Sequence, residues 1–140
     1  MSGPGTRYDL SDRDYRSLAR FRHALRVFTR FSEEAARDAG LTPSQHQLLL
    51  AVRGWAGEGD PSVSEIAERL QLRPNSALEL VTRAEEAGLV TRTVPPDDQR
   101  RHEIRLTRTG SDKLRSLSVL HRRELRRFRA EMNDILVELD

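Results

Sequence analysis

The sequence contains no cysteine among its 140 residues. This absence excludes disulfides, thiolate zinc sites, cysteine nucleophiles and peroxide-sensing thiols. Long apolar runs are lacking too, since the run at 48–52 is far shorter than the roughly 18 residues that a membrane span needs. The first residues do not show the charged region and apolar stretch of a secretory signal. We therefore expect a soluble, cytoplasmic protein with no membrane partner.

Lysine is nearly absent, because Lys113 is the only one and arginine carries the rest of the positive charge. The formal net charge of +2 conceals a segregation along the chain, with +4 over residues 1–31, −5 over 32–88, +7 over 89–129 and −4 over 130–140. Arginine forms bidentate contacts with phosphate and guanine, although a GC-rich genome would produce the same bias without a functional cause. The basic blocks are therefore candidate contacts for nucleic acid.

Patterns typical of enzymes are also missing. The sequence has no glycine-rich phosphate loop, no nucleophile elbow and no pair of histidines at metal-ligand spacing. Adjacent glutamates at 33–34 and 85–86 diverge by about 100° on a helix, so neither pair can converge on one substrate atom. We expect no enzymatic activity, no cofactor and no bound metal ion.

The first half of the chain predicts two helices. A tail over residues 1–11, rich in glycine and proline, precedes apolar residues that recur at steps of three or four over 12–39. This spacing predicts a long amphipathic helix, which Gly40 ends. Thr42, followed by proline, then caps a second helix that runs through 45–53.

The next segment predicts a helix-turn-helix. Ser62 or Ser64 caps a short helix over 65–70, and a tight turn at 72–75 leads into a helix over about 75–87. Two short helices joined by a brief turn are typical of this motif. The side chains expected to point inward are Ile66, Ala67, Leu70, Leu72, Ala77, Leu78, Val81 and Ala84.

A β-hairpin should follow. Residues 89–94 and 102–107 are short runs of β-branched residues with partial alternation. The turn formers and charges of 95–101 separate them. The pattern predicts two antiparallel strands with a basic tip.

The C-terminal segment predicts one more long helix. Thr107 or Thr109 caps it, and no breaker interrupts residues 111–139. Its apolar stripe, at steps of three and four, predicts a seam with another helix and consists of Leu125, Phe128, Met132, Ile135 or Leu136, and Leu139. The expected fold is mainly α with a small β-hairpin: a winged helix-turn-helix lobe (42–107) between long N- and C-terminal dimerisation helices (12–39 and 111–139), in a single domain (12–140).

Five short motifs occur in order along this framework. They are Gly40 to Gln45, Ser64 to Leu70, Glu85 to Val90, Asp98 to Arg100, and Ile104 to Gly110. With these motifs the chain resembles the multiple antibiotic resistance regulator (MarR) family of bacterial transcription regulators over about residues 12–125. The resemblance implies a homodimeric, ligand-responsive repressor that binds a palindromic operator in double-stranded DNA.

The fourth predicted helix is the candidate for insertion into the major groove, whose width fits a helix about 10–12 Å across. Its groove-facing candidates share the face opposite the apolar stripe and are Arg73, Asn75, Ser76, Glu79, Thr82 and Arg83. Asn75 and Ser76 also suit capping of this helix, and that interpretation stays open. Glu79 departs from the basic or polar residue usual in the family, and an exposed carboxylate repels phosphate unless it accepts from cytosine.

The wing provides the second candidate contact. By the resemblance, Asp98 supports the hairpin and Arg100 reaches the minor groove, with Arg101 as a further cation nearby. Gln99 replaces the usual first arginine of this motif, and prolines at 95–96 replace the usual Asp-Pro. The alternative is a solvated hairpin tip without a DNA contact.

Family members often bind small anionic aromatic effectors between the dimerisation helices and the DNA-binding lobe. By that analogy alone, the lining candidates here are Arg22, Arg26, His46 and Trp55. A different class of function is also open, because winged helices can bind proteins through the same face. The acidic segment 32–88 makes a protein-interaction module without DNA binding the competing hypothesis.

Overall fold

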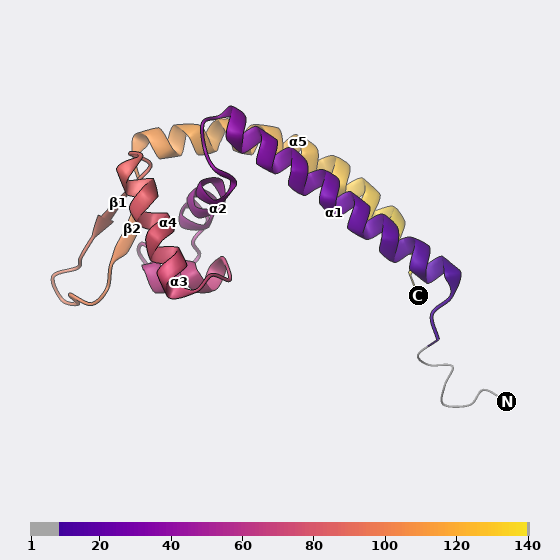
Figure 1. Cartoon of the computed structure of the whole chain (residues 1–140), viewed down its shortest axis with the longest axis horizontal. Coiled ribbons are helices and arrows are strands. Elements are labelled where there is room, and N and C mark those ends of the chain that lie inside the picture. The colour runs from indigo at the N-terminus through magenta and orange to yellow at the C-terminus, as the bar shows by residue number, and fades with distance from the viewer. Residues whose placement is uncertain (1–8, 140) are drawn as a thin grey trace. The chain divides into compact units, whose positions relative to one another are not determined.

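The computed structural model describes residues 9–139, and within this range it is mainly helical with one two-stranded antiparallel sheet (Figure 1). The elements are α1 (Asp12–Asp38), α2 (Pro43–Arg53), α3 (Val63–Arg69), α4 (Pro74–Glu86), β1 (Val90–Thr93), β2 (Glu103–Leu106) and α5 (Arg108–Glu138). The predicted fold class and element order are therefore confirmed. Of the predicted tail, residues 1–8 lie outside the described residues.

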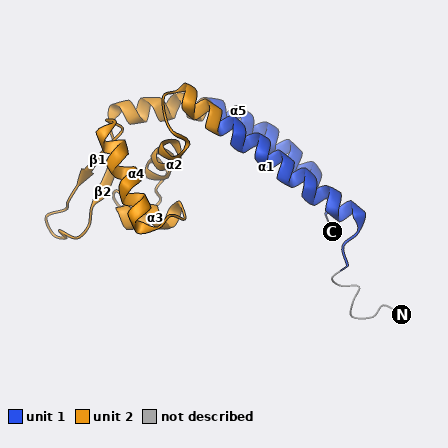
Figure 2. Cartoon of the chain, in the orientation of Figure 1, with its two compact units in different colours: residues 1–32, 120–140 blue, residues 33–119 orange. Residues whose placement is uncertain are grey.

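The chain divides into two compact units, coloured separately in Figure 2. One contains residues 33–119, which include the helix-turn-helix and the hairpin. The other contains the first part of α1, to residue 32, and the last part of α5, from residue 120. Each unit is described by itself below, and we call them the winged-helix unit and the arm unit.

The winged-helix unit is organised around one apolar core. Its largest fully buried side chains come from α2, α3, α4, β2 and α5 and are Leu48, Leu49, Ile66, Val81, Ile104 and Leu117. Local signals set the ends of the helices that supply them. Thr42 and Ser62 each form a capping box, in which the hydroxyl accepts the amide of the third helical residue and that residue's side chain accepts the amide of the cap. Gly40, at φ +78°, ends the preceding helix as predicted.

Two predictions for the helix-turn-helix are wrong. Leu72 and Leu78 were expected in the core but are 37% and 43% exposed. The small side chains at 77, 81 and 84 fill the core side of α4, so Leu78 lies at the edge of that stripe and faces out. The capping interpretation of Asn75 and Ser76 is wrong as well, because the N-cap residue is Arg73 and no side chain caps this helix.

The wing is anchored to the segment before α3. β1 and β2 pair antiparallel, with Val90 opposite Leu106. The Val63 amide donates to the His102 carbonyl at 3.1 Å, and the Ile104 amide donates to the Pro61 carbonyl at 2.9 Å. Residues 61–63 therefore add an edge to the hairpin and fix its base next to α3.

The start of α5 is fixed by Thr107, one of the two predicted caps. Its hydroxyl accepts the Gly110 amide at 3.0 Å and donates to the Gly88 carbonyl at 2.6 Å. A Cβ atom at Gly110 would collide with the Leu89 carbonyl oxygen, so this position needs glycine. The hairpin and α5 are thereby joined closely to the end of α4.

In the arm unit, α1 and α5 lie antiparallel. Ser17 and Arg20 near one end of α1 contact Glu138, whereas Ser32 lies 2.8 Å from the His121 ring nitrogen. Between these contacts the Phe28 and Phe128 ring centroids are 5.3 Å apart. The seam predicted from the α5 stripe thus forms partly within one chain. Other large apolar side chains of this unit remain exposed, among them Leu18, Val27, Leu125, Leu136 and Val137.

Candidate nucleic-acid interface

The outer face of α4 presents a short polar surface. Asn75, Ser76 and Glu79 are exposed, and Thr82 is half-buried. The Thr82 hydroxyl donates to the Leu78 carbonyl at 2.8 Å, so its proton is already used within the helix. Asn75 and Ser76, freed from the capping role, are therefore the available hydrogen-bonding groups of the first turn.

Glu79 and Arg83 form an ion pair on this face, with 2.6 Å between carboxylate and guanidinium. Both side chains are largely exposed, at 62% and 70%, so the pair adds little to stability. Its electrostatic consequence is larger, because each charge cancels most of the other at a distance. Neither residue therefore acts as an independent charge on the helix.

The wing tip is ordered by Asp98. Its carboxylate accepts the Arg100 amide at 3.1 Å, and its carbonyl accepts the Arg101 amide at 3.2 Å. The Asp98 amide in turn donates to the Pro95 carbonyl at 3.3 Å. Arg100 is exposed, and its guanidinium pairs with none of the residues that the structure describes.

Arg101, in contrast, is fully engaged. Its guanidinium lies 2.6 Å from Glu65 and 3.1 Å from Glu103, and it donates to the Asp60 carbonyl at 3.0 Å. The hydrogen bonds to Glu103 and then Glu65 raise the pKa of Arg101, and the pKa of Glu65 is lowered chiefly by the Ser62 backbone amide and further by Arg101. The geometry makes Arg101 a tie between the wing and α3 rather than a free cation.

Two further arginines of the wing are neutralised in the same way. Arg92 lies 3.3 Å from Glu85 of α4, and Arg105 lies 2.9 Å from Asp60. Arg92 and Arg105 were not among the predicted site residues. Partners such as Asp60 and Arg105 are far apart in sequence, and no spacing rule pairs them.

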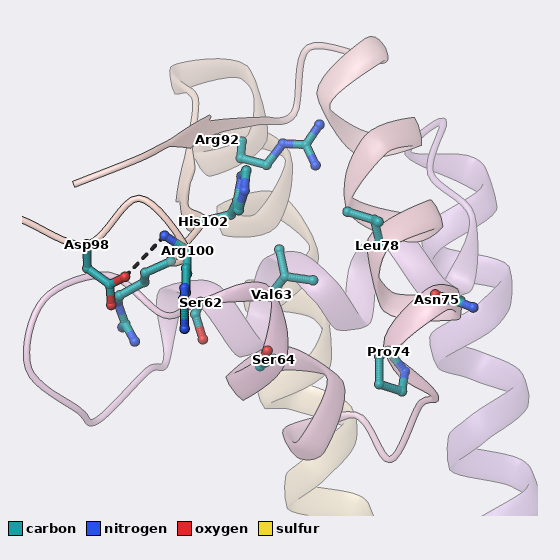
Figure 3. A pocket seen from close by; sticks show the side chains of 11 residues that line it. Ser62, Val63, Ser64, Pro74, Asn75, Leu78, Arg92, Asp98, Arg100 and His102 are labelled. Atoms are coloured by element: carbon teal, nitrogen blue, oxygen red, sulfur yellow. Dashed lines mark hydrogen bonds between the residues drawn. The ribbon is translucent and has the colours of Figure 1, made fainter. Parts of the chain in front are cut away.

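A groove of about 610 Å³ lies between the first turns of α3 and α4 and the wing (Figure 3). Its lining consists of Ser62, Val63, Ser64, Pro74, Asn75, Leu78, Arg92, Asp98, Arg100, Arg101 and His102. The groove thus brings together four of the predicted DNA-binding residues, namely Asn75, Asp98, Arg100 and Arg101. The other five, Arg73, Ser76, Glu79, Thr82 and Arg83, are on or beside α4 but outside this lining.

The four residues proposed by analogy for an effector pocket are divided between the units. Arg22 and Arg26 are exposed on α1 in the arm unit, whereas His46 is buried on α2 and Trp55 is half-buried just after it. The arm unit does contain a cavity of about 430 Å³ between α1 and α5, with Phe28, Glu124 and Phe128 in its lining, but neither arginine lines it. The effector pocket therefore stays a prediction.

The described residues contain neither a cluster of metal ligands nor a membrane-spanning helix. In residues 9–139 no three histidine, aspartate or glutamate side chains are grouped so that they could hold a metal ion. None of the helices in this range is long and apolar enough to span a membrane.

Comparison with known proteins gives consistent results. Residues 39–101 match the model of the MarR family. Over 80 residues the chain is 32% identical to the HTH-type transcriptional repressor MdtR of Bacillus subtilis (strain 168), a match that covers 57% of this chain and 50% of that protein. This chain therefore spans about half the length of that curated relative.

Solved structures show the same fold. AbsC, a MarR family transcriptional regulator from Streptomyces coelicolor, superposes with a TM-score of 0.75 at 24% identity, over 94% of this chain and 90% of that one. A MepR mutant from S. aureus, bound to an oligodeoxyribonucleotide, superposes with a TM-score of 0.68 at 19% identity, over 94% and 100% of the two chains. With a winged helix-turn-helix at its centre and a family match over residues 39–101, the chain is similar to the MarR family of transcriptional regulators.

Proposed function

We propose that this protein binds double-stranded DNA sequence-specifically and regulates transcription. The observation that carries this proposal is that an exposed polar first turn on α4 occurs in the same unit as Arg100, which lies on an ordered wing tip and has no partner among the described residues. A helix of this width enters the major groove, and an arginine on the wing suits the negative potential of a narrow minor groove. The MepR structure, which holds an oligodeoxyribonucleotide, supports the proposal by its fold.

The expected binding form is a homodimer. In the arm unit Leu18, Leu125 and Leu136 remain exposed although α1 and α5 already pack on each other. Apolar stripes of this kind mark association surfaces, and a two-fold dimer presents two recognition helices about one turn of DNA apart. A palindromic operator follows from that symmetry.

The same proposal includes repression of the regulated genes and a response to a small ligand. MdtR, one of the curated relatives, is named a repressor, which supports repression here. A small anionic aromatic effector, with Arg22, Arg26, His46 and Trp55 as its candidate contacts, rests on the family resemblance.

Selection of bound sequences from a random pool of duplex DNA tests the proposal. We expect enrichment of a palindrome, and we expect Arg100→Ala to weaken binding to the enriched duplex while the protein stays folded. Gln99→Ala, a change in the neighbouring exposed residue, is the matched control and should bind as the wild type does. A folded protein that enriches no sequence would favour the protein-interaction module instead.

A further inference from the structure

Leu78 is the apolar residue that the fold leaves exposed on α4. It is 43% exposed, whereas the core side of the same helix is formed by Ala77, Val81 and Ala84, all fully buried. One exposed leucine is common on protein surfaces and means little alone. Its position is informative, because Leu78 lines the groove between α4 and the wing.

The groove around Leu78 is lined by both apolar and polar side chains. Figure 3 shows its side chain projecting from α4 into the space that Val63 and Arg92 also face. Asn75 is one helical turn earlier, and Thr82, one turn later, is tied to the Leu78 carbonyl through its hydroxyl. The wing side of α4 therefore offers base edges an aliphatic group between two short polar residues.

We propose that Leu78 is a specificity-determining residue that reads the 5-methyl group of thymine. In the major groove thymine alone among the four bases presents a methyl group, and proteins read it by apolar contact. A leucine beside Asn75 on the same helix suits this task, since the amide can bond to one base edge while the leucine covers the methyl of a neighbouring pair. This inference rests on the proposed DNA binding and adds one preference, for thymine over uracil or cytosine at a single position of each half-site.

A purely structural role for Leu78 makes a different prediction. If the side chain only supported α4 or the wing, its replacement would weaken binding to all duplexes equally. If it reads the methyl group, its replacement removes one preference and leaves the others. The two roles therefore separate on a comparison of duplexes that differ by one methyl group.

The experiment is a uracil scan of the duplex that the wild-type chain selects from random DNA. Each thymine is replaced singly by deoxyuridine, and affinities are measured for wild type, Leu78→Ala and Leu78→Met. For wild type we expect a loss of about fourfold at one position per half-site, the fold-change that corresponds to one buried methyl group at about 0.8 kcal/mol. Leu78→Ala should abolish this loss, and Leu78→Met, which keeps an apolar side chain, should retain most of it. Leu50→Ala, a change in a leucine on α2 that is 49% exposed and outside the groove lining, is the matched control and should keep the wild-type pattern.

The other possible outcomes overturn either the role of Leu78 alone or the proposed DNA binding as well. An identical uracil pattern in wild type and Leu78→Ala, or no position at which uracil weakens binding by the wild type, overturns the assignment of Leu78 while leaving DNA binding intact. Failure of the wild type to select any sequence overturns the proposed function and this inference with it. If Leu78→Ala does not fold, Leu78→Gln, which preserves length and helix propensity, takes its place with the same expected loss of discrimination.

Discussion

Glu79 is the residue on α4 whose charge is least favourable for DNA binding. Its ion pair with Arg83 changes the charge that this face of α4 presents. Considered alone, its carboxylate would repel phosphate. At 2.6 Å from the Arg83 guanidinium, it instead holds that guanidinium and cancels its charge. The main effect of Glu79 is therefore to occupy the Arg83 guanidinium, which would otherwise be available to bind phosphate. Direct repulsion of phosphate by the Glu79 carboxylate is the smaller effect.

Glu79→Gln should strengthen binding to every duplex, because it releases Arg83 to contact phosphate at nearly constant side-chain shape. One added phosphate contact steepens the plot of log K against log salt concentration by about 0.9. Titrations of duplex DNA with wild type and with Glu79→Gln at several salt concentrations measure both the affinity and this slope. Glu86→Gln, which makes the same charge change at another exposed position on α4, should alter the slope less.

A different result would reassign Glu79. If Glu79→Gln leaves general affinity unchanged but relaxes discrimination at one base pair by about 1–3 kcal/mol, the carboxylate accepts from cytosine N4. If neither Glu79→Gln nor Arg73→Ala has any effect, α4 does not face DNA at all.

The wing depends on contacts that reach beyond the hairpin itself. Arg101 joins it to Glu65 in the capping box of α3, and two backbone hydrogen bonds join it to residues 61–63. The tip, by contrast, is ordered by Asp98 alone among its described side chains. Arg100 and Arg101 are neighbours in sequence, yet the Arg100 guanidinium has no partner among residues 9–139, whereas Arg101 ties the wing to α3.

Arg101→Gln should loosen the wing base, with faster hydrogen exchange of the Val63 and Ile104 amides and a lower melting temperature. The same change at the neighbouring tip residue, Arg100→Gln, should leave that exchange unchanged, because the Arg100 side chain has no partner among the described residues. Equal protection of both amides in Arg101→Gln and wild type would contradict the role of Arg101 as a tie.

The lowered pKa of Glu65 adds a pH dependence to the same contact. A carboxyl whose folded-state pKa lies below its unfolded value stabilises the fold at neutral pH, and this contribution is lost as the pH falls through the acid range. Because Arg101 causes part of the shift, Arg101→Gln should lose less stability than wild type between neutral and acid pH. Thermal melts across that range measure the difference.

Elements bounded by local signals could be predicted from the sequence, and those that depend on distant partners could not. Thr42, Ser62 and Gly40 act on residues three to five positions away, so their patterns placed the helix ends to within about two residues. Leu78 was misplaced because a periodic stripe does not say how wide the core side of a helix is. The tie made by Arg101 was missed because its partner Glu65 is 36 residues away in sequence.

The proposed homodimer depends on the exposed apolar side chains of the arm unit. Leu125 is 48% exposed on the same helix whose Phe128 and Ile135 pack within the unit, so one chain leaves part of its apolar surface uncovered. Sedimentation at micromolar concentration should give twice the 16.0 kDa mass of one chain. Leu125→Glu should shift the protein toward monomer, whereas Val119→Glu, at an exposed site in the winged-helix unit, should not. A stable wild-type monomer would rule out the dimer and the palindromic operator.

The salt dependence of binding to the selected duplex tests the central claim, that α4 and the wing bind DNA, most directly. Binding that neutralises phosphates releases counterions, so the account predicts that log K falls linearly with log salt concentration, with a slope of several units for two wings and two recognition helices. Arg100→Ala should reduce the magnitude of that slope by up to about 2, one phosphate-region contact for each protomer. Affinity that does not change with salt, or a slope identical in wild type and Arg100→Ala, would contradict the claim.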